Sequence, residues 1–260
     1  MTKGISDVTF IQVGSGDGRR VEGAVPVEEQ IVLSVNAIDL VGLRCTPVEL
    51  EELALGFLFN EGLIDGIADV ADVRICGTGR CVDIWLNKDI EPPALRTITS
   101  GCSGGTTFES LVDAQHPIVS DLTVTPGQIA ALMRQLQAAG ELYRRSRGIH
   151  TSALAEGDRL ISLAEDVGRH NTLDKIAGCC LRRGQPTADR ILLTSGRVSS
   201  EMLSKAAQMA VPVVASMTSP TSLSVELAQA WDVALIGYVR GPTFRIYAGA
   251  HRVAGLEDEL

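Results

Sequence analysis

The segment that decides the fold of this chain runs from Arg190 to Ser216 and reads RILLTSGRVSSEMLSKAAQMAVPVVAS. Its first five and last six residues predict two strands, and the residues between them predict a helix from Ser199 to Ala210. Ser199 or Ser200 would cap that helix, because a side-chain oxygen there accepts a hydrogen bond from the first turn. A strand, a helix and a strand in this order favour an α/β layer.

The same alternation of strand and helix continues on both sides of this segment. Before it we expect strands at 149–155 and 160–165 and a helix at 171–183, and after it a helix at 222–230 and strands at 233–239 and 244–248. The second half therefore predicts a mostly parallel or mixed sheet covered by helices.

The first half predicts a smaller α+β unit. A strand begins at Ile31, Asn36-Ala37 predicts a turn, and a second strand ends at Arg44. Thr46 is the expected N-cap of a helix that Gly62 ends. The remaining expectation for this unit is a hairpin of strands at 70–75 and 82–86 around the turn at 77–80.

Residues 95–120 are rich in Ser, Thr and Gly and predict a boundary, so we expect domains at 1–120 and 121–260. Thr125-Pro126 would open the first helix of the second domain, and Gly140 would end it. The predicted class is α/β (α+β), with a mixed sheet in the C-terminal domain.

The composition of the chain indicates which classes of binding partner to expect, nucleic acid and membranes among them. The chain has 260 residues, 45% of them hydrophobic, with a net charge of -9 and a pI of about 5.0. A broad nucleic-acid surface is not expected, because phosphate contacts need a basic face. The N-terminus lacks the apolar core of a signal peptide and no apolar run is long enough to span a membrane, so we expect a cytoplasmic protein without membrane contact.

Polar turns at the predicted strand ends are the candidate binding residues, since ligands of such sheets bind there. The first turn, Glu165–Asn171, leads into a helix whose free N–H groups suit a phosphate, with Arg169 as a charged fork and His170 as a stacking or hydrogen-bonding group. The alternative is a helix start that Asn171 caps.

Two further turns carry similar residues. Thr194–Arg197 repeats the Gly-Arg pair of the first turn, and both turns could form one anion pocket. In Gly237–Thr243, Tyr238 could stack on a base and Arg240 could meet a phosphate. The alternatives are a capped turn and a hairpin turn with a solvated arginine.

The six cysteines are predicted to be free thiols, ligands or nucleophiles rather than a disulfide framework. Cys102 lies among small residues in Thr99–Thr107, where a thiol can be exposed, although a plain turn is the alternative. We assign the other five, Cys45, Cys76, Cys81, Cys179 and Cys180, to structural roles; Cys76 and Cys81 flank the hairpin turn and could face each other.

A zinc site of the nucleobase deaminase type is not expected. Such sites use His-x-Glu and Pro-Cys-x-x-Cys, whereas His150 is followed by Ser152 and no Pro-Cys-x-x-Cys is present. A histidine on a strand is more often structural than catalytic.

Several motifs together resemble the formate dehydrogenase accessory sulfurtransferases of the FdhD/NarQ type. They are DVGRHNTLDK at 166–175, TSGR at 194–197, PTSLSVELA at 220–228, GYVRG at 237–241 and ELALGFLFNEG at 52–62. The likeness runs from about residue 27 to 252.

This resemblance implies a cytoplasmic, homodimeric sulfurtransferase with a cytidine-deaminase-like C-terminal domain that lacks zinc. It implies transfer of sulfur from a cysteine desulfurase, as a persulfide on Cys102, to a bis-molybdopterin guanine dinucleotide of molybdenum or tungsten for the formate dehydrogenase catalytic subunit. GDP or GTP would mimic that substrate. The expected cofactor-binding residues are Asp166, Gly168, Arg169, His170, Asn171, Ser195, Gly196, Arg197, Tyr238, Val239, Arg240, Gly241, Pro242 and Thr243.

One departure from the family pattern leaves an alternative open. The family loop commonly reads Cys-x-x-Cys, but Gly105 stands at the second cysteine position here. A second thiol could resolve the persulfide on Cys102 and form a disulfide. Without it, release needs another thiol or direct attack by the metal centre, or the chain is a cofactor-binding chaperone without sulfur transfer.

Overall fold

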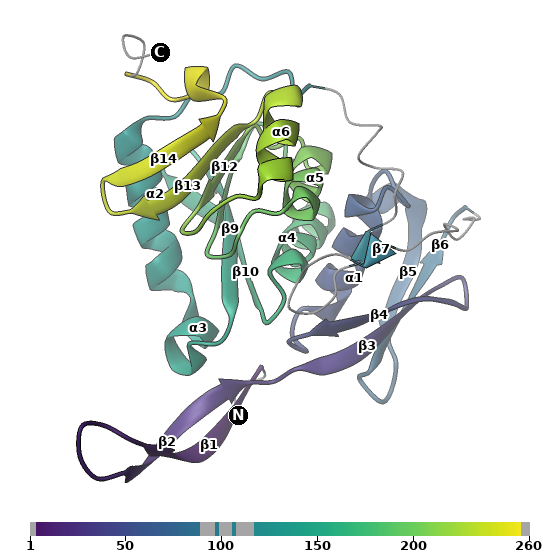
Figure 1. Ribbon diagram of the computed structural model, residues 1–260. Coiled ribbons are helices and arrows are strands. Elements are labelled where there is room, and N and C mark those ends of the chain that lie inside the picture. The colour runs from purple at the N-terminus through teal and green to yellow at the C-terminus, as the bar shows by residue number, and fades with distance from the viewer. Residues whose placement is uncertain (1–3, 89–96, 99–105, 108–116, 256–260) are drawn as a thin grey trace.

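Two sheets form the body of the protein. The structure is a computed structural model that describes residues 4–88, 97–98, 106–107 and 117–255. The larger sheet has the strand order β10–β9–β11–β12–β13–β14 (Figure 1). Its strands are β9 (His150–Glu156), β10 (Arg159–Asp166), β11 (Ile191–Thr194), β12 (Val213–Ser216), β13 (Ala234–Arg240) and β14 (Thr243–Ala248).

This sheet is mixed, as the alternating pattern predicts. β11, β12 and β13 are parallel, whereas β9 pairs antiparallel with both β10 and β11, and β14 pairs antiparallel with β13. The ends of β10, β11, β12 and β13 therefore share one edge. The α/β class is confirmed, and the finer likeness to cytidine deaminases stays a prediction.

Helices cover both faces of the larger sheet (Figure 1). α2 (Pro126–Ala139) packs on one face, followed by the short α3 (Glu141–Ser146). α4 (Arg169–Arg183), α5 (Ser200–Gln208) and α6 (Ser222–Ala230) pack on the other. Ser199 caps α5, which confirms the first of the two predicted caps, and Thr125 caps α2, which was expected to begin at Thr125-Pro126; each side chain accepts a backbone N–H of its own helix. α3 has no counterpart in the prediction.

The smaller sheet belongs to the first half and has the order β4–β3–β6–β5. It contains β3 (Glu29–Val35), β4 (Ile38–Cys45), β5 (Val70–Ile75) and β6 (Cys81–Leu86), and a short 3-10 helix, Ile67–Asp69, precedes β5. The turn at Asn36-Ala37 is confirmed, with both residues at positive φ. α1 (Leu50–Asn60) packs its leucines on this sheet.

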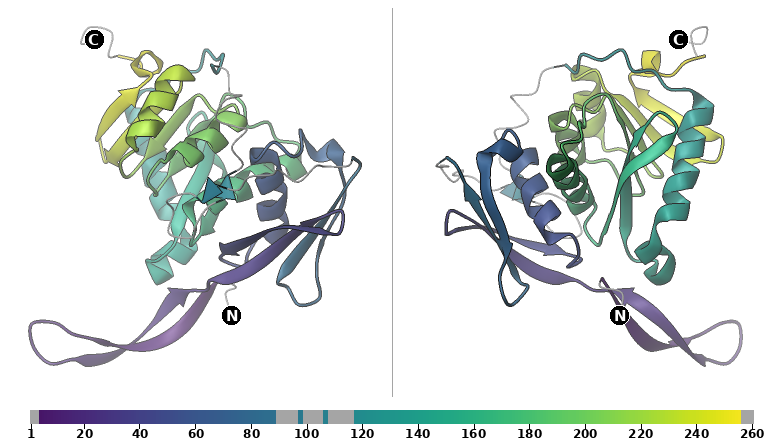
Figure 2. Two further views of the ribbon diagram at one scale, coloured as in Figure 1. Left: turned by 45° about the vertical axis from the view of Figure 1, so that its right-hand side comes forward. Right: turned by 180° about the vertical axis from the view of Figure 1, so that it is seen from behind.

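α1 and α4 lie side by side and join the two halves (Figure 2). The helices touch through glycines: a Cβ at Gly56 would meet backbone atoms of Asp174 and Gly178, and a Cβ at Gly178 would meet the backbone of Glu52. The absence of side chains at this crossing lets the backbones meet directly. The two sheets use residues 29–86 and 150–248, and the exact boundary at 120 stays a prediction.

The N-terminal arm has no counterpart in the prediction. β1 (Ile5–Gln12) and β2 (Arg19–Pro26) form an antiparallel hairpin that extends away from both sheets (Figure 1). Its strands mix polar with apolar residues and are largely exposed, so the buried alternation that marks a strand is weak. Two short strands, β7 (Thr97–Ile98) and β8 (Thr106–Thr107), pair antiparallel.

Two local predictions about helix starts are wrong. Thr46 does not cap α1, which begins at Leu50 after Glu49 in a left-handed conformation. Thr46 is instead buried, and its hydroxyl accepts a hydrogen bond from Val167 N at 3.1 Å. Asn171 does not cap α4 either, because that helix begins at Arg169 after Gly168. Both side chains are used instead in contacts between the first and second halves of the chain, Thr46 with Val167 and Asn171 with Arg44.

Cys76 and Cys81 do face each other across the hairpin turn, but the expectation that the cysteines are free thiols, ligands or nucleophiles is wrong for this pair. The two cysteines form a disulfide across the hairpin of β5 and β6. Cys45, Cys179 and Cys180 are free, as expected, and Cys45 and Cys180 are buried. Burial raises the pKa of Cys45 to about 12 and that of Cys180 to about 11, so both thiols are protonated at neutral pH.

Candidate functional site

A pocket opens where the strands of the larger sheet end. Its volume is about 500 Å³, within the range of small-molecule sites. Its polar lining includes Ser195 after β11, Thr218 after β12, Arg240 at the end of β13 and His150 at the start of β9. Tyr143 of α3 and Arg147 at its C-cap also line the pocket, together with Gln137 and Thr151. We refer to this cavity as the strand-end pocket.

Two residues predicted from separate turns, Ser195 and Arg240, meet in this pocket. They are 45 positions apart in sequence and reach the same cavity because β11 and β13 are parallel and flank β12. Ser195 is held in place by Thr151, whose backbone N–H donates to the Ser195 hydroxyl at 2.9 Å. The structure thus brings one residue of the second turn and one residue of the third turn to the same cavity.

The first and second turns also meet, although their strands are not neighbours. β9 lies between β10 and β11, which the sequence did not indicate. Gly196 nevertheless packs against Arg169 and His150: a Cβ at Gly196 would lie 3.0 Å from Arg169 Cβ and 3.3 Å from His150 Nδ1. A glycine is therefore suited to this position, because any side chain would displace groups at the pocket.

Several arginines lie at or near the pocket, although the protein as a whole is acidic. Burial lowers the pKa of His150, and the neighbouring charges of Arg169 and Arg197 lower it further. His150 is consequently neutral at pH 7, while arginines supply the positive charge. Arg169 is only 4% exposed, whereas Arg197 and Arg240 are exposed. Arg147 and Arg240 line the pocket itself, and Arg169 and Arg197 act on His150 from beside it, so the pocket is suited to an anion.

Behind the pocket, His170 lies in the interior as a neutral side chain. Its Nε2 is 3.2 Å from Ser199 Oγ and 3.3 Å from a carboxylate oxygen of Glu201. Burial, followed by the neighbouring groups Arg169, Lys205 and His150, lowers the pKa of His170 to about 2. The neighbouring cations and burial outweigh Glu201, so this contact is a hydrogen bond of a neutral imidazole and not an ion pair.

Replacing His170 with Gln is expected to reduce the acid sensitivity of folding. The unfolded chain binds a proton on this histidine near pH 6.5, whereas the folded chain does not until about pH 2, so stability falls as the pH drops below 6.5. By pH 5 this group costs about 2 kcal/mol. Urea unfolding from pH 7 to 5 measures the effect, with the exposed His251→Gln as control; equal slopes in both variants would contradict it.

Most polar side chains of the 166–175 motif face the interior and not the pocket. Asp166 forms an ion pair of 2.6 Å with Lys175 and accepts hydrogen bonds from Thr46 N, Gly168 N and Asn171 Nδ2. Asn171 also donates to Arg44 O at 2.8 Å. These contacts join β4 to the start of α4, so the contacts of Asp166 and Asn171 hold the two halves together. Their roles as cofactor ligands remain predictions.

The third turn places only part of its predicted residues at the pocket. Arg240 lines it, but the Val239 side chain lies in the core. Tyr238 has a positive φ, and the guanidinium of Arg245 lies 4.4 Å from the centre of its ring. That stacking occupies one ring face that was expected to receive a base. The remaining predicted residues of this turn, Gly241, Pro242 and Thr243, are exposed.

Sequence reasoning missed several pocket residues. His150 was assigned a structural role, and Tyr143, Arg147 and Thr218 were not singled out. α3 is positioned by Glu165, whose carboxylate accepts the backbone N–H groups of Leu142 and Tyr143 at 2.8 Å each. The polar run at 143–147, two residues before the strand that begins at His150, is the signal in the sequence that could have indicated them.

Two other candidates differ from the pocket. A hollow of about 600 Å³ lies along the arm and α3, but Asp7 and Arg145 there already lie within 3.5 Å of each other. Cys102, the predicted sulfur carrier, and Gly105 lie outside the described residues. Among the described residues, no group of three His, Cys, Asp or Glu is placed to hold a metal ion. None of the described helices has the length and apolarity to cross a membrane.

The fold and the pocket define an α/β protein with a candidate binding pocket at its strand ends. Residues 26–254 match the model of the FdhD/NarQ family, and the chain belongs to that family. It is 34% identical to the sulfur carrier protein FdhD of Staphylococcus haemolyticus (strain JCSC1435) over 236 residues, covering 88% of this chain and 89% of the relative.

Further relatives agree with this assignment. The chain is 35% identical to the sulfur carrier protein FdhD of Staphylococcus aureus (strain MRSA252) over 237 residues, covering 89% of each chain. The fold resembles the crystal structure of a protein from Desulfotalea psychrophila described as a formate dehydrogenase accessory protein. That match has a TM-score of 0.83 and 24% identity, and covers 96% of this chain and 99% of the other.

Proposed function

We propose that this protein is a sulfur carrier that accepts persulfide sulfur from a cysteine desulfurase on Cys102. It then passes the sulfur to a bis-molybdopterin guanine dinucleotide, its substrate, for the catalytic subunit of formate dehydrogenase. The names of its relatives support the sulfur-carrying part of this proposal. The observation that carries the substrate part is the convergence of Ser195, His150 and Arg240 in one pocket near Arg169 and Arg197.

The pocket chemistry fits a nucleotide phosphate. An arginine guanidinium forms charge-assisted hydrogen bonds with phosphate oxygens, and Arg240 and Arg147 both line the cavity. Neutral His150 and the Ser195 and Thr218 hydroxyls add groups that donate or accept hydrogen bonds without negative charge. The carboxylate of Glu165 is not part of the pocket lining and accepts the backbone N–H groups of Leu142 and Tyr143 in α3.

Sulfur uptake is a thiol exchange. The Cys102 thiolate would attack the terminal sulfur of the donor persulfide, forming the Cys102 persulfide and releasing the donor cysteine as a thiolate. Cys45 and Cys180 are unsuited to this step, because burial raises the pKa of both thiols. Cys102 is thus preferred over these two cysteines on chemical grounds.

Peptide mass mapping tests the carrier role. After incubation with a cysteine desulfurase and cysteine, we expect one additional sulfur atom on the Cys102 peptide. Cys102→Ala should abolish this labelling and the activation of a formate dehydrogenase, whereas Cys179→Ala should preserve both. Activation by Cys102→Ala would favour the cofactor-binding chaperone instead.

GDP binding tests the pocket. Arg240→Ala is expected to raise the Kd for GDP about tenfold, because one charge-assisted hydrogen bond contributes roughly 1.4 kcal/mol. Titration calorimetry measures this value. Arg74→Ala is the control, since Arg74 is exposed on β5, pairs with Asp72 of the same strand and does not line the pocket. If the Kd for GDP is unchanged in Arg240→Ala, the nucleotide does not bind in the strand-end pocket.

We further expect the protein to be a cytoplasmic homodimer. It acts as an enzyme, a sulfurtransferase, if the Cys102 persulfide forms and is discharged repeatedly. Protein purified without added metal should contain no stoichiometric zinc, and elemental analysis measures the zinc content. Sedimentation of the purified chain measures the dimer.

A further inference from the structure

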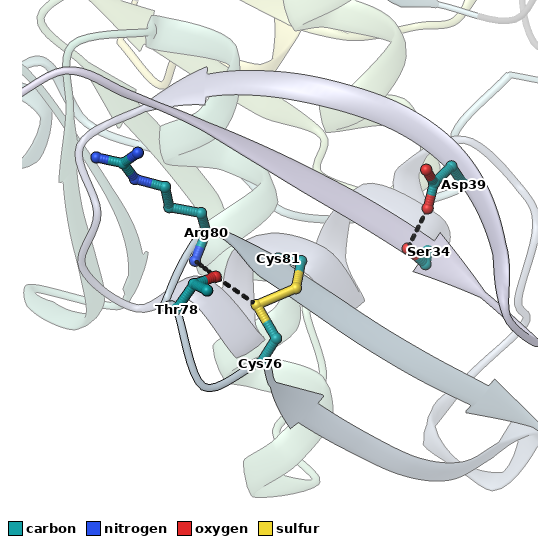
Figure 3. The surroundings of a disulfide bond; sticks show 6 residues. All are labelled: Ser34, Asp39, Cys76, Thr78, Arg80 and Cys81. Atoms are coloured by element: carbon teal, nitrogen blue, oxygen red, sulfur yellow. Dashed lines mark hydrogen bonds between the residues drawn. A yellow bond between two sulfur atoms is a disulfide. The ribbon is translucent and has the colours of Figure 1, made fainter.

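The disulfide between Cys76 and Cys81 is a chemical feature that the proposed function does not use. It joins the residue after β5 to the first residue of β6 across a turn of four residues (Figure 3). Both cysteines are half-buried, while Gly77, Thr78 and Arg80 in the turn are exposed. A small thiol can therefore approach the bond from the turn.

The sheet holds the two cysteines together without needing the bond. Cys76 N donates to Cys81 O at 3.0 Å, and Gly79 N donates to Cys76 O at 2.8 Å. Ile75 pairs with Val82 in the strand register directly beside them. The Cα atoms are 5.4 Å apart, which is an ordinary spacing for such a pair. Reduction would thus leave both thiols in position to form the bond again.

A purely stabilising role is not favoured by this placement. The cysteines are separated by only 5 positions in sequence, and a short closed loop removes little freedom from the unfolded chain. The turn is also held from outside, because Val32 N donates to Arg80 O at 2.9 Å. The hydrogen bonds of three strands fix this turn whether the cysteines are oxidised or reduced.

The two sulfur atoms have different surroundings. The Thr78 hydroxyl oxygen lies 3.1 Å from Cys76 Sγ, and because a disulfide sulfur has no proton, the hydroxyl is the donor (Figure 3). The same oxygen accepts from Arg80 N at 3.3 Å, which orients the hydroxyl. Hydrogen bonds to a thiolate are stronger than those to a neutral sulfur. Cleavage that leaves the negative charge on Cys76 is consequently the favoured direction.

We propose that Cys76 and Cys81 form a reversible thiol–disulfide exchange site for thiolate reductants, in which the reductant attacks Cys81 and Cys76 leaves. The incoming thiolate forms a bond to Cys81 Sγ, and the electron pair of the broken S–S bond passes to Cys76 Sγ. A second reductant thiolate then attacks the sulfur that the first reductant molecule contributed to the mixed disulfide. This forms the disulfide of the reductant and releases Cys81 as a thiolate. This site is separate from Cys102 and the strand-end pocket.

Glutathione exchange tests the site on the full chain. With rapid acid quenching and peptide mapping, we expect glutathione on the Cys81 peptide in preference to the Cys76 peptide. Over a series of glutathione redox ratios the pair should interconvert while the circular dichroism of the fold is unchanged. The proposal would be overturned by any of three results: glutathione attached mainly to Cys76, a disulfide that is reduced only when the protein unfolds, or a reduced pair that does not form the disulfide again.

Alkylation rates test the role of Thr78. Each cysteine is measured alone, Cys76 in the Cys81→Ala variant and Cys81 in the Cys76→Ala variant. At pH 7 the thiolate fraction of Cys76 should be about tenfold higher than that of Cys81, consistent with one hydrogen bond to a charged group. Adding Thr78→Val to Cys81→Ala should remove the difference, and adding Thr78→Ser should retain it. Because Thr78 is exposed, both variants should fold. Equal reactivity with valine and serine would overturn the assigned direction.

Discussion

Gly56→Ala is expected to destabilise the protein by more than about 4 kcal/mol, at the upper end of single substitutions. A Cβ at this position would overlap the carbonyl oxygen of Asp174 and lie 2.7 Å from Gly178 N. Both are backbone atoms of α4, so no change of rotamer can make room. α1 and α4 would have to separate, which would open the packing between the two halves.

The gain in helix propensity does not offset this overlap. Alanine is favoured over glycine within a helix by about 1 kcal/mol, which is well below the expected loss. Gly127→Ala on α2 provides a matched control, because its added Cβ would meet only Thr125 Oγ1 at 4.0 Å. Urea unfolding should show a large loss for Gly56→Ala and none for Gly127→Ala. If Gly56→Ala were as stable as the wild type, α1 and α4 would not be in direct backbone contact at Gly56.

The sequence predicts the strands and helices of the larger sheet because their signals are local. Apolar runs mark β11 and β12, and the hydroxyls of Thr125 and Ser199 mark helix starts within three residues of their partners. The glycine contact of α1 with α4 has no such signal. Gly56 reads as an unfavourable helix residue until the second helix is placed against it.

The candidate site shows the same limit. Ser195 and Arg240 could be predicted because polar turns after parallel strands converge at one edge. His150 could not, because its place depends on β9 lying between β10 and β11. Asp166 also follows a strand, yet its carboxylate accepts from Thr46 N, 120 positions earlier. A polar turn alone does not distinguish a ligand contact from a contact between domains.

Lys205→Met is expected to cost about 3–5 kcal/mol, because it leaves buried carboxylates without their cation. The Lys205 ammonium lies 2.9 and 3.0 Å from the two carboxylate oxygens of Asp174 and 3.1 Å from Glu61. Its side chain is 2% exposed. Burial lowers the pKa of Lys205, but Asp174, Glu61 and Glu201 more than compensate and hold it above its usual value. The lysine is therefore charged in the folded protein.

Arg182→Met is the matched control, since Arg182 also joins α4 to α1. Its guanidinium lies 2.8 Å from Glu51, but both side chains are partly exposed to solvent. Water screens such a pair, so the expected loss is below about 1 kcal/mol. Equal losses in the two variants, measured by urea unfolding at pH 7, would contradict the assignment of Lys205 to a buried network.

The pH dependence of Lys205→Met adds a second readout. Burial already raises the pKa of Asp174, and removal of the lysine would raise it further in the folded state. The folded variant would then bind a proton at a pH where the unfolded chain has released it, so its stability rises as the pH falls. Relative to wild type, Lys205→Met should recover stability between pH 8 and pH 5. Adding Asp174→Asn should remove much of that recovery, because the amide does not titrate.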